Sequence, residues 1–393
     1  MSQWREITLR EAGVTLIDCD HRTPPPSENG HPYVAIPQLK QGRLDLSDAR
    51  RITEAHFVEW TRKANPQPND VVLSRRCNPG ETAFVPNGMK FALGQNLVLL
   101  RADESKMFPP FLRWLVRGEK WWEQIDKFIN VGAIFESLRC ADIPKFQLPI
   151  PPLDEQRAIA AVLGALDDKI ELNRRMNETL EALAQSLFKS WFVDATQSAL
   201  PKGWRETTLE DAILIHDSKR IPLSSRERAM RRGKYPYHGA ASVMDYVDDY
   251  LFDGVYTLIG EDGSVVNDDD TPVLQYVWGK FWVNNHAHVL TGKNGVSVEH
   301  LLLFLKTVNI RPFVTGAVQP KLNQGNLCRV PFVLPPELVS KGFAGIIEPM
   351  FARIRANTEE SRTLAALRDA LLPKLLSGEL RVPAAAKLVE ARA

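Results

Sequence analysis

The sequence is short of the features that mark membrane, secreted or metal-stabilised proteins. It has no apolar run of about 18 residues, so no membrane span is expected. Its N-terminus, MSQWREITLREAG, lacks the apolar segment of a secretory signal. The cysteines Cys19, Cys77, Cys140 and Cys328 form no Cys-x-x-Cys pair, which argues against disulfides or a zinc site. We therefore expect a cytoplasmic protein.

Signatures of catalysis are missing as well. The FPPF segment at Phe108–Phe111 approaches the Asp/Asn-Pro-Pro-Tyr/Phe signature of amino-methyltransferases, but Phe108 cannot accept a hydrogen bond from the target amino group. Gly292-Lys293 lacks the rest of a phosphate-binding loop. His286 and His288 have no acidic or cysteine partner at a usual ligand spacing, so they are read as rings on a strand. We expect no catalysis, metal or cofactor for this chain.

Basic residues gather in one segment of an otherwise balanced chain. The 393 residues carry a net charge of +1 and a hydrophobic content of 44%, enough for two or three globular domains. Residues 217–234 hold seven basic residues against two acidic ones, a local net charge of +5. Such a segment suits phosphate binding, although a solvated basic loop is the alternative. Its basic members are Lys219, Arg220, Arg226, Arg228, Arg231, Arg232 and Lys234.

The most informative feature is an internal repeat at an offset of 184 residues. Pro151-Pro152 and Pro335-Pro336 open two stretches that align without a gap over roughly forty residues. The globular parts before them share landmarks too. Leu138 matches Leu322, the WRE triplet at Trp4 recurs at Trp204, and Gly132-Ala133-Ile134 matches Gly316-Ala317-Val318. The chain is thus predicted to be a head-to-tail doubling of one unit.

The predicted fold class is α/β (α+β), with two pseudo-repeated globular domains, each followed by a long helix. We assign residues 1–152 and 197–336 to the globular domains, 153–196 and 337–382 to the helical regions, and 383–393 to a tail. Predicted strands are Asp70–Ser74, Gln95–Leu100, Val255–Ile259 and His288–Leu290. Predicted shorter helices are Pro110–Phe128 and Val298–Val308.

Both long helices carry an apolar seam with steps of three and four residues, which is typical of a coiled coil. Asp154 is the expected N-cap of the first helix. In the second, Gly345 and Pro349 predict a start near Pro349 or a bend there. Asn173 and Asn357 stand in the polar centres of the seams, so we expect an antiparallel pair whose register they set. Two separate amphipathic helices are the alternative. The seams are Ile159, Leu163, Leu166, Ile170, Asn173, Asn177, Leu180, Ala184, Leu187 and Trp191, and Phe343, Ile347, Met350, Ile354, Asn357, Ser361, Leu364, Arg368, Leu371 and Leu375.

Several segments resemble the specificity subunits of type I restriction–modification systems. The conserved helical regions of that family are similar to LPIPPLDEQR at Leu148–Arg157, to LFKSWF at Leu187–Phe192 and to LLPKLLSGEL at Leu371–Leu380. The segments LIGEDG at Leu258–Gly263 and NNHAH at Asn284–His288 resemble a common variety of the family's target-recognition domain. The sequence departs from the pattern at residues 337–340, which read ELVS where the first repeat has LDEQ.

This resemblance implies a function as well as a fold. Each domain would read one half of a split duplex DNA target, and the paired helices, roughly 60 Å long for forty residues, would set the unspecified spacer. The helices would bind two modification (methyltransferase) subunits, and restriction (translocase–nuclease) subunits could join. S-adenosylmethionine, ATP and magnesium would serve those partners. A coiled-coil scaffold that binds proteins is the alternative.

Candidate DNA contacts are basic side chains in loops, where Arg and Lys can neutralise phosphates and Arg can also pair with guanine. Each one could equally be an ordinary surface charge. The candidates are Arg22, Lys40, Arg43, Arg75 and Arg76 in the first domain, and Lys219, Arg220, Arg231, Arg232, Lys234 and Lys321 in the second.

Overall fold

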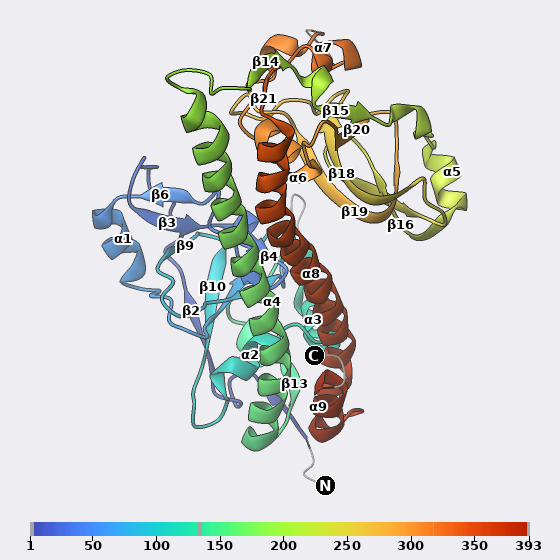
Figure 1. Cartoon of the computed structure of the whole chain (residues 1–393). Coiled ribbons are helices and arrows are strands. Elements are labelled where there is room, and N and C mark those ends of the chain that lie inside the picture. Colours follow the sequence, from blue (N-terminus) through green and yellow to red (C-terminus); the bar gives the residue numbers. More distant parts are fainter. Residues whose placement is uncertain (1–3, 132–135, 317, 391–393) are drawn as a thin grey trace. The chain divides into compact units, whose positions relative to one another are not determined.

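A computed structural model describes residues 4–131, 136–316 and 318–390 (Figure 1). The chain divides into two compact units, Met1–Glu171 with Ser361–Ala393, and Leu172–Glu360. Each unit therefore contains a globular part and one half of each long helix. None of the helices in the described part of the chain is long and apolar enough to cross a bilayer.

The first unit is built on a sheet with strand order β2-β10-β7-β8, in which neighbouring strands run antiparallel. β3 pairs with β6 and runs parallel to β9, and β1 pairs with β13. The bounds are β1 Arg5–Thr8, β2 Val14–Asp18, β3 His31–Val34, β4 Leu39–Lys40, β5 Arg43–Leu44, β6 Arg50–Ile52, α1 Glu54–Thr61, β7 Val71–Ser74, β8 Thr82–Phe84, β9 Ala92–Leu93, β10 Leu97–Ala102, α2 Pro109–Leu115, α3 Glu119–Phe128, β11 Asn130–Val131, β12 Glu136–Ser137 and β13 Gln147–Ile150.

The second unit has a sheet with strand order β15-β20-β18-β19-β16-β17. Its bounds are β14 Arg205–Thr208, β15 Ile213–Ile215, α5 Ser225–Met230, β16 Arg232–His238, β17 Val243–Val247, β18 Phe252–Gly260, β19 Leu274–Val283, β20 Ala287–Gly292, α6 Val298–Leu305, α7 Gln324–Cys328 and β21 Pro331–Leu334. β18 and β20 are the predicted strands at Val255 and His288, and α6 is the predicted helix at Val298.

Strand registers show that both units share one arrangement of paired strands, which we call the frame. β1–β13 corresponds to β14–β21, and β2-β10-β7-β8 corresponds to β15-β20-β18-β19. In both units one strand pair is parallel, with Tyr33 opposite Ala92 in the first and Tyr237 opposite Trp282 in the second. Leu138 and Leu322, matched by sequence offset, make the same backbone hydrogen bond, to the carbonyl oxygens of Arg75 and Glu261. The matched Gly132-Ala133-Ile134 triplet lies outside the described residues, as does Ala317 in its counterpart.

The long helices are α4, Leu153–Phe188, and α8, Glu337–Leu376 (Figure 1). In the second unit Asn173 contacts Asn357, and further along α4 Asn177 donates to the carbonyl of Ile354. The partner number falls as the α4 number rises, so the helices are antiparallel. All residues of both predicted seams are buried or half-buried. The predicted α+β class with an antiparallel helix pair is confirmed.

Three local predictions are corrected by the structure. The single helix expected over Pro110–Phe128 is two, α2 and α3, because Gly118 adopts an extended conformation as the N-cap of α3. α4 begins at Leu153, which places Asp154 in its first turn instead of at the N-cap.

The third correction concerns the start of the second long helix, which Gly345 and Pro349 predict near Pro349; the alternative outcome, a bend at Pro349, stays a prediction. α8 begins at Glu337 and continues through Pro349 as helix. A proline inside a helix leaves the carbonyl four residues earlier without its usual donor. Here that carbonyl belongs to Gly345, and both residues are exposed, so water can satisfy it.

In the segment expected as a tail, residues 383–393, the structure has α9, Val382–Glu390, with Ala385 fully buried in the first unit's core.

Candidate nucleic-acid interface

In each unit three chain segments meet where one central strand ends and its neighbour begins. We call this place the strand-end corner. In the first unit, β7 ends beside the turn that opens β10, and the amide of Arg75 donates to the carbonyl of Asn96 over 2.9 Å. In the second unit, the amide of Glu261 donates to the carbonyl of His286 over 2.8 Å at the corresponding place after β18. Arg75 and Glu261 therefore occupy equivalent positions.

The first unit's corner is hollow. The cavity measures about 490 Å³ and is lined by His21, Arg75, Arg76, Cys77, Gln95 and Asn96. Its walls come from the loop after β2, the end of β7 and the turn before β10. A second hollow, lined by Tyr33 and Arg50 among others, shares Gln95 and Asn96 with the first. The first hollow thus combines cationic donors with amide groups, which suits a ligand rich in hydrogen-bond acceptors.

Arg75 is the most unusual cation in this hollow, since its side chain is only 8% exposed. One terminal nitrogen reaches the carbonyl of Leu138 and the other approaches Nδ1 of His21, each at 3.5 Å. Both distances are at the far limit of a hydrogen bond. Within the described residues, its Nε has no hydrogen-bond partner at all. The guanidinium is thus held in place but keeps unused donors.

Asp18, Cys19 and His21 bring possible metal ligands close together at the same corner. Burial and the neighbouring Asp18 carboxylate raise the pKa of the Cys19 thiol to about 11. A thiol binds zinc as the thiolate, so this environment opposes metal binding. The Arg75 guanidinium beside His21 opposes a second cation further.

The corner of the second unit is filled by a closed ionic network. Asp217 accepts hydrogen bonds from the ring of His288, the side chain of Gln324 and the amide of Val289. Burial alone would raise the pKa of Asp217, but these hydrogen bonds and the nearby His288 lower it below its ordinary value.

Arg220 completes this network. Its side chain is 11% exposed and reaches Glu261 at 2.7 Å, Asp217 at 3.2 Å and the carbonyl of Ala287 at 2.6 Å. The charges of these groups are satisfied internally.

Most candidate cations of the first unit are already paired. Arg22 bonds to Asp20 and Glu59 and lies 4.7 Å from the Trp60 ring. Lys40 pairs with Asp45 at 2.6 Å. Arg43 contacts Glu171 and Asp167 on α4 and so ties β5 to the helix. Arg75 and Arg76 are the candidates that the structure brings together, in the hollow.

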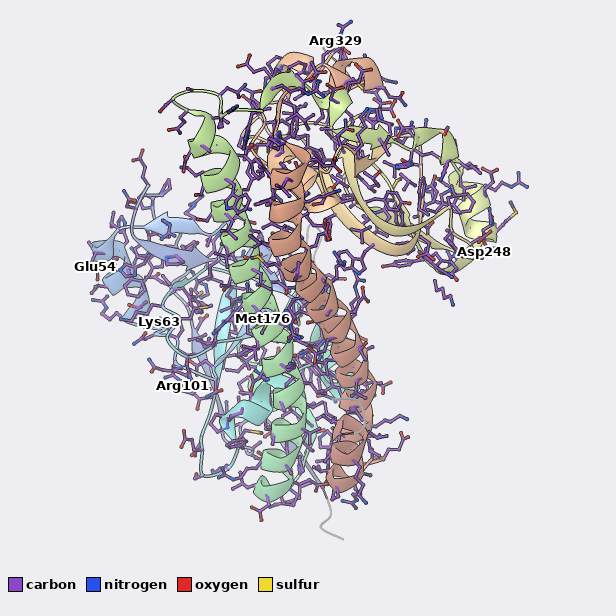
Figure 2. The ribbon with its side chains drawn as sticks, viewed as in Figure 1. Glu54, Lys63, Arg101, Met176, Asp248 and Arg329 are labelled. Carbon is purple, nitrogen blue, oxygen red and sulfur yellow. The ribbon has the colours of Figure 1, made fainter. Side chains whose placement is uncertain are left out.

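The candidates of the second unit are of three kinds: buried in the ionic network, close to an acidic side chain at the surface, or exposed. Arg220 is the buried one. Arg231 pairs with Asp248, labelled in Figure 2, at 2.9 Å. Lys321 lies 3.9 Å from Glu261. Lys219, Arg232 and Lys234 are exposed, and none has an ion-pair partner within 4.0 Å in the part of the chain that the structure describes. Which of these side chains contact DNA stays a prediction.

The list of candidate DNA contacts, drawn from basic residues, omits several residues of these surfaces. His21, Gln95 and Asn96 line the hollow but are neither Arg nor Lys, so a search for those two residue types does not select them. On β16 and β19, Lys234 and Lys280 lie 5.2 and 4.5 Å from the rings of Tyr235 and Tyr250, and those rings are 5.1 Å apart. The adjacent Lys234-Tyr235 pair was the available signal, since aromatic and basic residues together mark nucleic-acid surfaces.

Comparisons with known proteins place the chain. A family model described as the type I restriction modification DNA specificity domain matches residues 21–182 and again residues 201–364. The MjaIX specificity subunit, from a type I restriction enzyme of Methanocaldococcus jannaschii, is 25% identical over 365 residues, which cover 85% of this chain and 82% of that protein.

Two further relatives agree. A putative type I restriction enzyme specificity subunit of Haemophilus influenzae is 34% identical over 144 residues, 37% of this chain and 36% of that one. The crystal structure of the type I restriction–modification S subunit from M. genitalium superposes with a TM-score of 0.61 at 19% identity, covering 95% and 96% of the two chains, and so shares the fold. With the family's domain matched twice over most of its length, the chain belongs to the type I restriction–modification specificity subunits, the recognition and non-catalytic components of these systems.

Proposed function

We propose that this chain reads a split duplex DNA target, one half with each unit, while the α4–α8 pair sets the spacer between the halves. The observation that carries this proposal is the shared frame with unlike corners. Arg75 and Arg76 follow β7 at the positions where Glu261 and Asp262 follow β18. Opposite charges at equivalent positions suit two targets of different base sequence.

The helix pair supports the role of a spacer. Its seam is apolar toward both ends and polar in the middle, where Asn357 donates to Oδ1 of Asn177 over 2.8 Å. A buried amide contact favours one register over the alternatives, because a shifted register would leave it unsatisfied. A fixed register would give the spacer a fixed length.

The partners follow from the family. We propose that the chain works in the cytoplasm and binds two modification subunits, which methylate adenine with S-adenosylmethionine. Restriction subunits would add translocation and cleavage driven by ATP and magnesium. The chain itself would contribute recognition and assembly.

Methylome sequencing tests the split target. The chain would be expressed with its methyltransferase partner in a host without other modification enzymes. We expect one methylated motif made of two short halves and an unspecified spacer of constant length. Exchange of residues 197–336 for the corresponding domain of a relative should change one half alone. A short contiguous motif, or a motif that survives the exchange, would favour the protein-binding scaffold instead.

Lengthening the helices tests the spacer role. One heptad inserted before Asn173, with a matching heptad in α8, should lengthen the spacer or prevent assembly. A matched control inserts seven residues into the loop at residues 197–203, outside the helix pair. An unchanged spacer in an assembled helix variant would refute this role.

A further inference from the structure

The guanidinium of Arg75 has the properties of a binding group that waits for a ligand. A buried arginine usually has most of its five donors satisfied, because an unpaired buried charge is costly. Among the described residues, the guanidinium of Arg75 makes only two hydrogen-bond contacts, both of 3.5 Å, and its Nε makes none. The side chain also lines an open hollow. An acceptor that enters the hollow can therefore compete for the terminal nitrogens, whose present contacts are long.

The equivalent position in the second unit shows that the frame does not need this arrangement. There Glu261 pairs with Arg220 at 2.7 Å, and His288 donates to the carbonyl of Leu322 over 2.7 Å. In the first unit, the carbonyl of Leu138, equivalent to that of Leu322, receives only the long contact from Arg75 within the part of the chain that the structure describes. The polar groups at this corner can thus be fully paired within the protein, as in the second unit, and in the first unit they are not.

The difference also indicates what kind of acceptor binds. A phosphate is present along every duplex, so a phosphate anchor would be expected in both units. The second unit has a carboxylate at the equivalent position, and this carboxylate pairs with Arg220 and offers no donor to a phosphate. The two units have the same frame but different side chains at this position. Such a side chain should recognise the part of the target that also differs between the half-sites, which is the base sequence.

We infer that Arg75 reads a guanine in the first unit's half-site, with its fork of donors directed at O6 and N7 on the major-groove edge. Arg is the usual partner of this edge because two parallel hydrogen bonds match its planar geometry. The side chains of Gln95 and Asn96, which line the same hollow, are placed to contact the neighbouring groups. This inference rests on the proposed function.

The test compares methylated motifs of the assembled complex. Arg75→Lys keeps the charge but loses the fork, and Arg75→Gln loses both. Both variants should relax one G·C position in one half-site, with a loss of discrimination there of roughly ten- to a hundred-fold. The other half-site should be unchanged. Lys106→Gln removes an exposed charge beyond the opposite end of β10 and should leave the whole motif intact.

A second measurement does not depend on any variant folding. Replacing each guanine of the first half-site in turn by 7-deazaguanine removes N7, and wild-type complex should bind one substituted duplex more weakly than the rest. If the Arg75 variants lose affinity uniformly and keep an unchanged motif, Arg75 contacts a phosphate and the inference is overturned. Equal binding of the wild-type complex to all substituted duplexes would overturn it too. A wild-type motif that is not split would instead refute the proposed function, so the two failures are distinguishable.

Discussion

The two units place the same strand end beside the same carbonyl, Leu138 in one and Leu322 in the other, yet surround it with different chemistry. The first unit has a recessed arginine with few partners. The second has an acid, Glu261, within a network that includes Arg220, Asp217 and His288. The comparison teaches that the frame fixes where a side chain stands, while the residue at that place decides whether the corner is closed or open to a ligand.

The largest effect should come from opening the closed corner. Asp217→Ala removes the acceptor shared by His288, Gln324 and Arg220, and it leaves buried donors without a partner. We expect the second unit to lose about 3–5 kcal/mol of stability. Asp18→Ala, at the equivalent position in the first unit, should cost about 1 kcal/mol or less, because its partner His21 is half exposed. Hydrogen exchange resolved by mass spectrometry assigns each loss to its unit, and equal losses would contradict the difference between the corners.

A second difference lies on the helix that follows the central sheet. His300 on α6 stands where the first unit has Phe111 on α2, both three residues after the N-cap. His300 lies among aromatic rings, with Phe192 at 4.3 Å and Phe343 at 5.3 Å. Burial lowers the pKa of His300 to about 3. The folded state therefore keeps the imidazole neutral across the range where the unfolded chain, with a pKa near 6.5, takes up a proton.

The sign of the pH effect follows from that difference. Between pH 6.5 and 3 the unfolded state binds more protons, so His300 stabilises the second unit above pH 6.5 and loses this contribution as the pH falls. From pH 6.5 to 5 the loss should be about 2 kcal/mol. His300→Phe, which copies the first unit, should remove that part of the pH dependence. Unfolding by denaturant at several pH values measures it, and an unaltered pH profile in the variant would exclude His300 as its source.

The polar part of the helix pair also differs between the units. In the first unit Arg368 on α8 pairs with Asp167 on α4, an ionic contact. In the second unit the contacts involve asparagine side chains, with Asn173 donating to the carbonyl of Asn357 over 3.3 Å and to the Glu360 carboxylate over 2.7 Å. Asn173→Leu with Asn357→Leu should keep the helical content and raise stability by about 1 kcal/mol, while allowing more than one register.

Distances between spin labels measure that register. Labels at Leu183 and Ile346, both exposed, should give one distance in the wild type and a broadened distribution in the double variant. Thr179→Leu adds an apolar side chain on an exposed face of α4 and serves as the control. A single unchanged distance in the double variant would mean that the asparagines do not set the register.

The sequence predicts the features that depend on the spacing of residues along the chain. It misses those that depend on which distant segments meet in the folded protein. The seams could be predicted because steps of three and four residues place side chains on one helix face whatever surrounds them. The strand at Val71 could be predicted from its β-branched run. The break at Gly118 could not, because helix propensity around one glycine does not tell a cap from a tolerated interior residue.

The candidate site shows the same division. Arg75 could be selected by residue type, but its burial and its neighbours could not be predicted. The hollow is formed by His21, Arg75 and Asn96, which come from segments far apart in the sequence and meet only in the folded sheet. No local pattern indicates that Glu261 occupies the matching position, because equivalence is established by strand register and the intervening loops differ in length.

The smallest effect separates surface cations from internal ones in the second unit. Arg232 and Lys234 are exposed, whereas Arg220 is committed to Glu261 and Asp217. Each of Arg232→Gln and Lys234→Gln should lower the slope of log K against log salt concentration by about 0.9, the value for one lost phosphate contact. Arg220→Gln should leave this slope unchanged and destabilise the unit instead, since its charge is used inside the fold. Fluorescence anisotropy with the assembled complex at several salt concentrations measures the slopes. A decrease for Arg220→Gln equal to that for Lys234→Gln would mean that the closed corner opens to DNA, and the contrast between the two corners would then disappear.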